Sequence, residues 1–69
     1  MQLSTRNQLA GTVVSVASGE AMSTVRIETR SGDTITAAIT RDAAEELKLE
    51  PGAEVTALVK ATEVSLAVD

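Results

Sequence analysis

Two short polar segments hold the residues of this chain that are best suited to bind a small anion. Ser4-Thr5-Arg6-Asn7 precedes the first strand-like run, and Lys60 stands inside the apolar run 55–61. A hydroxyl, a guanidinium and an ammonium donate hydrogen bonds without offering a competing carboxylate. No acidic residue occurs among the first nineteen positions, so nothing nearby in sequence repels an anion. The two segments therefore predict a cradle for a tetrahedral oxyanion, provided that the fold brings them together.

Each of these residues also has an ordinary structural explanation. Arg6 could be a solvated side chain near the chain end, and Ser4 and Asn7 are common at turns and strand starts. Lys60 could be an edge-strand lysine that discourages aggregation, or one whose stem lies over apolar surface. The clustering of donors ahead of a strand favours the anion site over these alternatives.

Other kinds of site are disfavoured by what the chain lacks. It contains no His and no Cys, its carboxylates are scattered without EF-hand spacing, and its four glycines are spread one per turn or bulge. No carboxylate pair lies in an apolar setting that would tune one member for acid–base work. We therefore expect no metal site, no phosphate-binding loop and no enzyme activity.

The size of the chain predicts association. A domain of 69 residues buries only roughly 60% of the surface that its unfolded form exposes. Disulfides and metals, the usual supports of small domains, are excluded by the composition. The chain also lacks Phe, Tyr and Trp, so its core must consist of smaller apolar residues. An obligate oligomer follows.

The charge and hydropathy of the chain restrict the kinds of partner that it can bind and indicate its cellular location. The net charge of -4 repels polyanions, and no aromatic residue is present on which bases could stack. No apolar run is long enough for a membrane span, and the N-terminal residues do not have the pattern of a signal peptide. The sequence predicts a cytoplasmic protein that binds neither nucleic acid nor membranes.

The first part of the chain reads as three strands. Residues 9–17 form the first, in which Gly11 predicts a bulge or a close backbone approach. Val25 and Ile27 alternate with charged neighbours in the second strand, as in a half-buried antiparallel strand. A tight turn over 31–33 leads into a third strand over 34–40.

The second part reads as a helix and two further strands. Thr40 caps a short helix of about two turns within 40–49, and Pro51-Gly52 ends it. Strands over 53–61 and 64–68 follow. The resulting order, β-β-β-α-β-β, predicts an all-β fold with one short helix: a five-stranded, OB-fold-like Greek-key barrel.

Four segments, in this order and spacing, resemble a known family. They are Ser4-Thr5-Arg6-Asn7-Gln8-Leu9, Ala37-Ala38-Ile39-Thr40, Leu49-Glu50-Pro51-Gly52 and Val55-Thr56-Ala57-Leu58-Val59-Lys60-Ala61-Thr62-Glu63-Val64. The pattern resembles the Mop domain of molbindins, and the resemblance covers residues 1–69 as a single domain. Because the chain starts at Met1 and holds one copy, it is expected to be the free-standing form.

The resemblance implies a function and a set of ligands. It implies cytoplasmic storage or buffering of molybdate or tungstate by a homohexamer, a trimer of dimers, with anion sites between subunits. Ser4, Arg6 and Lys60 would be the side-chain ligands, with backbone N–H groups near Thr5 and Ala61 as further donors. Many relatives carry a serine where this chain has Ala43, so Ala43 would be a weaker contributor, through its backbone N–H.

Two other functions remain open at this point. One is a nucleic-acid-binding OB module, against which the missing aromatic residues and the negative charge both stand. The other is an accessory regulatory domain that works within a molybdate transporter or regulator.

Overall fold

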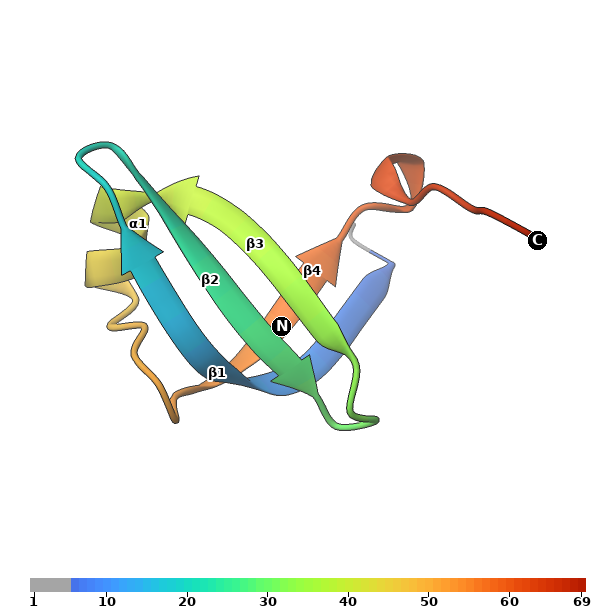
Figure 1. Cartoon of the computed structure of the whole chain (residues 1–69), viewed down its shortest axis with the longest axis horizontal. Coiled ribbons are helices and arrows are strands. Elements are labelled where there is room, and N and C mark those ends of the chain that lie inside the picture. The colour runs from blue at the N-terminus through green and yellow to red at the C-terminus, as the bar shows by residue number, and fades with distance from the viewer. Residues whose placement is uncertain (1–5) are drawn as a thin grey trace.

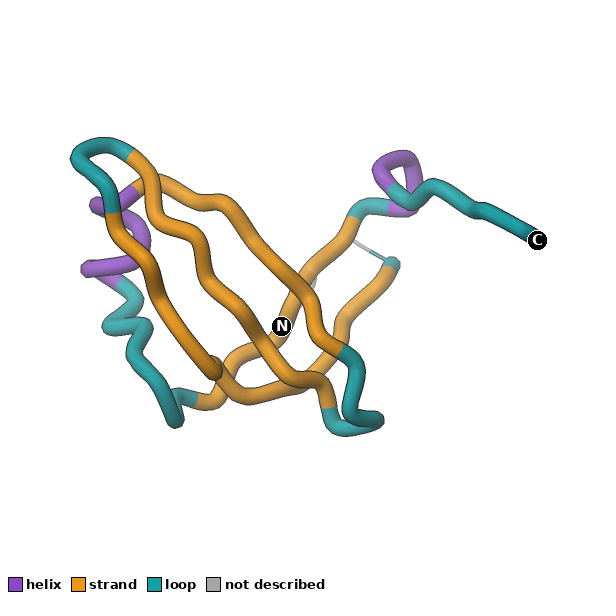
Figure 2. The backbone as a smooth tube through the Cα atoms, viewed as in Figure 1, coloured by secondary structure: helices purple, strands orange, loops and turns teal. Residues whose placement is uncertain are grey.

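The computed structural model describes residues 6–69, which form one four-stranded antiparallel sheet. The strands β1 (Asn7–Ser18), β2 (Met22–Thr29), β3 (Thr34–Thr40) and β4 (Glu54–Val59) lie in the order β3-β2-β1-β4. The helix α1 (Arg41–Glu46) connects β3 to β4, and a 3-10 turn, η1 (Ala61–Glu63), follows β4. Figures 1 and 2 show a strongly curled sheet, because β1 bends along its length.

The core lies on the concave side of the sheet and is small. Alternate residues of β2 are buried, as the two-residue period predicts, and Val25 and Ile27 retain only 1% and 6% of their exposure. Val13 of β1, at 2%, completes the buried apolar cluster. A core of this size supplies little stabilisation from burial, which agrees with the expectation that the chain associates.

The curl of the sheet depends on local features of β1. A Cβ at Gly11 would lie 2.5 Å from the carbonyl oxygen of Glu28, so only glycine permits the strands to approach there. The register of β1 against β2 shifts between Val13 and Ser15, which marks a bulge. The predicted close approach at Gly11 is confirmed, and the bulge lies slightly further along the strand.

The helix and the turns follow their predicted residues. The Thr40 hydroxyl accepts a hydrogen bond from the Ala43 N–H at 3.1 Å, which confirms the predicted N-cap. Gly32 and Gly52 adopt the left-handed conformation, with φ of 93° and 95°. The helix is shorter than the predicted range, ending at Glu46, and Lys48 at φ 54° turns the chain away from the helical path.

The predicted all-β, OB-like architecture with one short helix is confirmed, with one difference in the last segment. Residues 64–69, expected to contain a fifth strand, belong to no strand in the single chain. They leave η1 in an extended path that points away from the sheet, as Figures 1 and 2 show. A strand needs an edge to pair with, and this path brings the segment to neither edge of its own sheet.

Candidate functional site

The pairing of β1 with β4 brings together the two segments predicted to bind an anion. These strands are antiparallel, and their pairing begins with Asn7 opposite Val59. Arg6 immediately precedes that pair and Lys60 immediately follows it, so both cations lie at the same end of the two strands. Segments more than fifty residues apart in sequence thereby become neighbours.

The side chains of Arg6 and Lys60 belong to the same face of the strand pair. Gln8 and Leu58 lie directly opposite each other, and residues that are paired in this way project to one face. Continuing that register by two residues assigns Arg6 and Lys60 to the face of Gln8 and Leu58. Both cationic side chains are exposed in the single chain.

The start of β1 and the end of β4 form a corner of the sheet that holds Arg6 and Lys60. The electrostatics of this corner favour a bound anion. Like charges that face each other across two strands repel. Within residues 6–69, ion pairs join Arg30 to Glu54 and Arg41 to Glu45, and neither includes Arg6 or Lys60. The repulsion between the two cations is therefore not offset by a carboxylate from the described part of the chain. An anion placed between them would relieve it.

The backbone at this corner is held by hydrogen bonds that sequence reasoning did not assign. The Asn7 side-chain amide donates to the Val59 carbonyl at 3.0 Å and fastens the start of β1 to the end of β4. After Lys60, the Glu63 N–H donates to the Lys60 carbonyl at 2.9 Å and closes the turn η1. These bonds fix the direction in which the chain enters and leaves the corner.

Of the other predicted ligands, only Ala61 lies beside Arg6 and Lys60 in the part of the chain that the structure describes. Ser4 and Thr5 lie outside the described residues. Ala61 is the first residue of η1, next to Lys60, and is exposed. Ala43 lies on α1, which Figure 1 shows well away from the end of β4, and its N–H is already bonded to Thr40. A contribution from Ala43 to this corner would have to come from another copy of the chain.

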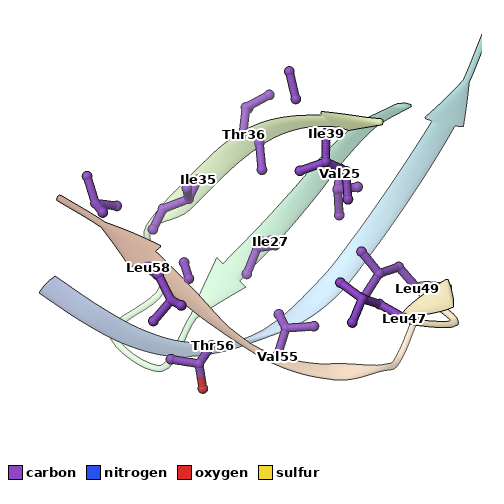
Figure 3. Close-up of a pocket in the computed structure, with 14 residues that line it drawn as sticks. Val25, Ile27, Ile35, Thr36, Ile39, Leu47, Leu49, Val55, Thr56 and Leu58 are labelled. Carbon is purple, nitrogen blue, oxygen red and sulfur yellow. The ribbon is translucent and has the colours of Figure 1, made fainter. Parts of the chain in front are cut away.

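A second feature, which the sequence did not predict, is an apolar groove of about 480 Å³ on the concave side of the sheet. It is lined by residues 35–39 of β3, residues 55–59 of β4, Val25 and Ile27 of β2, and Leu47 and Leu49 after α1. Figure 3 shows Ile35, Ile39 and Val55 pointing toward the space between β3 and β4, whereas Thr36 and Thr56 point away from it. No charged residue lines the groove, so it is unsuited to hold an oxyanion.

Among residues 6–69, no group of three or more acidic, His or Cys side chains gathers closely enough to hold a metal ion. In the same residues, no helix has the length and apolar character needed to cross a membrane.

Comparison with known proteins gives a family and several close relatives. The TOBE domain family matches residues 3–66. The molybdenum-pterin-binding protein 2 of Clostridium pasteurianum is 44% identical over 66 residues, which cover 96% of this chain and 97% of the relative. The molybdenum-pterin-binding protein MopB of Rhodobacter capsulatus is 47% identical over 96% of this chain, but the chain spans only 24% of its length.

A solved structure extends the similarity to three dimensions. The structure of the cytoplasmic molybdate-binding protein ModG, with molybdate bound, is 39% identical and superposes with a TM-score of 0.96. The match covers all of this chain and 49% of ModG. The resemblance to the Mop domain, first seen in short sequence segments, is thus confirmed over the whole length of the chain.

Proposed function

Because the chain belongs to the TOBE domain family, we propose that it binds molybdate or tungstate, in sites between subunits of an oligomer, for storage or buffering in the cytoplasm. Residues 1–69 act as one Mop domain in this proposal. The observation that carries it is the meeting of Arg6 and Lys60 at paired strand ends without a carboxylate partner within residues 6–69. Relatives that are named for binding molybdenum-pterin or molybdate support it.

The ligand set combines charge with directed hydrogen bonds. Arg6 and Lys60 supply two positive charges for the dianion, and Ser4 supplies a hydroxyl. Backbone N–H groups near Thr5 and Ala61 complete the donors. Each of these groups donates hydrogen bonds to the anion. The site captures the anion reversibly and performs no chemistry.

The proposed location between subunits follows from the exposure of the ligands. Arg6 and Lys60 are open to solvent in the single chain, where a salt-screened contact with an anion is weak. A second subunit covering this corner would exclude water and strengthen both interactions. The small core and the exposed apolar residues support such an assembly, which in this proposal is the homohexamer expected from the family resemblance.

Selectivity would come from the predominance of donors in the site and from its size. Hydrogen phosphate carries a proton that needs an acceptor, and the proposed ligand set offers only the Ser4 hydroxyl oxygen for it. Sulfate has no such proton, so discrimination against it rests on the smaller size of that anion. Molybdate and tungstate are close in size and charge, and both are expected to bind.

The chain itself argues against the other ligands considered. The names of some relatives include a pterin, but the chain has no aromatic residue on which a pterin ring could stack. The same absence, together with the net charge of -4, disfavours single-stranded nucleic acid. An accessory domain of a molybdate transporter or regulator would use the same anion site. That function differs from storage only in the larger protein or complex in which the domain works.

Titration calorimetry tests the proposal directly. Molybdate and tungstate are expected to bind, and sulfate much more weakly. Replacing Lys60 or Arg6 by alanine is expected to reduce affinity by about 2 to 4 kcal/mol, since each removes one partner of a desolvated charge pair. Arg26→Ala is the matched control, because Arg26 is exposed and pairs across the sheet with Thr36 and Ser15 rather than with a cation. Unchanged affinity in Lys60→Ala and Arg6→Ala would place the site elsewhere.

A further inference from the structure

The side chain of Asn7 ties together the two strand ends that carry the cationic residues. Its amide donates to the Val59 carbonyl at 3.0 Å, across 52 positions of sequence. Asn7 is half-buried, whereas Arg6 and Lys60 are exposed, so water competes less for this bond than for the two cations. Within residues 6–69, the register of β1 against β4 ends at this same pair. The bond therefore closes the end of the two paired strands.

The bond restrains one of the two peptide groups that flank Lys60. The Val59 carbonyl and the Lys60 N–H lie in one planar peptide group, so a hydrogen bond to the carbonyl restrains the whole group. The Lys60 carbonyl, in the next peptide group, accepts from the Glu63 N–H at 2.9 Å in η1. Hydrogen bonds thus hold the backbone on both sides of the Lys60 Cα. They set the direction in which the Lys60 side chain leaves the backbone.

The same bond restrains Arg6, which directly precedes Asn7. Because the side chain of Asn7 holds this residue against β4, the Arg6 Cα cannot move far from that strand. The two cations belong to one face and repel each other, and their repulsion favours opening of the strand ends. Strand ends are also where a sheet opens most easily. The Asn7 amide opposes both tendencies, because separation of the strands would break its bond.

The location of the bond argues for a role in the anion site rather than in the sheet as a whole. Six opposed pairs join β1 to β4, from Asn7–Val59 to Thr12–Glu54, and one side-chain bond adds little to such a ladder. Its effect on the spacing of the two cations is direct. It joins the residue after Arg6 to the residue before Lys60.

We propose that Asn7 is a positioning residue, which sets the spacing of Arg6 and Lys60 and thereby the size of anion that they bind best. This role rests on the proposed function, since it concerns the same site. Held at the spacing of a large tetrahedral dianion such as molybdate, the two cations bind it without rearrangement, and preorganisation of this kind raises affinity. They cannot close around the smaller sulfate, so at least one of its hydrogen bonds is longer and weaker.

An amide at position 7 suits this role, and a carboxylate of the same shape does not. Aspartate lacks the N–H that reaches the Val59 carbonyl. It would also place a negative charge next to Arg6 and close to Lys60, where it would compete with the bound anion. Asn7→Asp is therefore expected to weaken molybdate binding more than Asn7→Ala does. A weaker effect of aspartate than of alanine would overturn the proposal.

Titration calorimetry with molybdate, and with sulfate in competition, tests the role of Asn7 against a matched control. Asn7→Ala removes the bond at the end of β1 that lies next to Arg6. Ser18→Ala removes the 2.8 Å bond between the Ser18 and Ser23 hydroxyls at the opposite end of the same strand. Asn7→Ala is expected to lower molybdate affinity about tenfold, the scale of one hydrogen bond, and sulfate affinity less. Ser18→Ala is expected to leave both affinities unchanged.

The ratio of molybdate to sulfate affinity separates positioning from a general effect on the fold. A smaller fraction of folded protein lowers both affinities by the same factor, whereas a looser spacing of the cations lowers the ratio. An unchanged ratio in Asn7→Ala, or an equal loss of molybdate affinity in Ser18→Ala, would overturn the proposal. If the wild-type protein bound no molybdate at all, the proposed function would fail, and the role of Asn7 would fail with it. That outcome differs from wild-type binding that Asn7→Ala leaves intact, which removes the role of Asn7 alone.

Amide hydrogen exchange without added anion tests the bond itself. Exchange over residues 57–60 is expected to be faster in Asn7→Ala than in the wild type, because the end of β4 loses its tie to β1. Ser18→Ala is expected to exchange at the wild-type rate over the same residues. Equal rates in Asn7→Ala and the wild type would mean that Asn7 does not hold the strand end, and they would overturn the proposal whether or not the protein binds molybdate.

Discussion

Two segments of this chain have the same sequence pattern and opposite surroundings. In β2, Val25 and Ile27 alternate with polar residues, and both side chains are almost completely buried. In the C-terminal tail, residues 64–69, Leu66 and Val68 also alternate with small or polar residues, and both side chains are almost completely exposed. The difference lies in the neighbours: β2 has a strand on each side, and the tail has none.

The comparison shows what a two-residue alternation does and does not specify. It specifies that one face of a segment is made to be covered. It does not specify whether the cover comes from the same chain or from another one. For β2 the cover is supplied by β1, β3 and the concave core. For the tail, the single chain supplies no cover.

The largest expected effect on stability is in β2, the segment that is covered within its own chain. Ile27→Ala removes methyl and methylene groups from the buried cluster and leaves a cavity, so we expect a loss of about 2 to 5 kcal/mol in the free energy of unfolding. Ile27→Val, the milder control, is expected to cost about 0.5 to 1.5 kcal/mol. Urea unfolding followed by far-ultraviolet circular dichroism measures both. Equal small losses for the two variants would mean that the cluster around Ile27 does not hold the sheet together.

A smaller loss in the free energy of unfolding is expected at the N-cap of α1. Thr40→Ala removes the hydroxyl that accepts the Ala43 N–H at 3.1 Å, and a lost N-cap typically costs about 1 kcal/mol. Thr40→Ser keeps the hydroxyl and is expected to retain most of the stability. The same unfolding experiment reports both values. If serine proved as damaging as alanine, the threonine methyl, and not the cap, would carry the contribution.

Local sequence signals were enough to predict the elements that are completed within one chain. The alternation around Val25, the turn at Gly32 and the cap at Thr40 each depend on residues close in sequence, and each is confirmed. The meeting of Arg6 with Lys60 was predicted from residue types, and the β1–β4 register agrees with it. The register itself is a long-range property that no local signal encodes.

Features that depend on distant or separate surfaces could not be predicted in this way. The apolar groove arises from the bend in β1, which sets β3 and β4 on facing sides of one space. The tail reads as a fifth strand from its alternation, yet its pairing depends on an edge outside its own path. The role of Ala43 in anion binding likewise depends on how copies are arranged, and it stays a prediction.

The smallest expected effect is in the uncovered segment, and it depends on protein concentration. Leu66 is 93% exposed, so in dilute solution, where chains are separate, Leu66→Ala is expected to change the free energy of unfolding by less than about 0.5 kcal/mol. At higher concentration, the proposed association is expected to stabilise the folded wild type by mass action, and the variant is expected to fall progressively behind if Leu66 is covered in the oligomer. Unfolding midpoints measured over a dilution series separate the two regimes. A loss as large as that of Ile27→Ala at every concentration would mean that Leu66 packs against its own chain, and the contrast between the two segments would disappear.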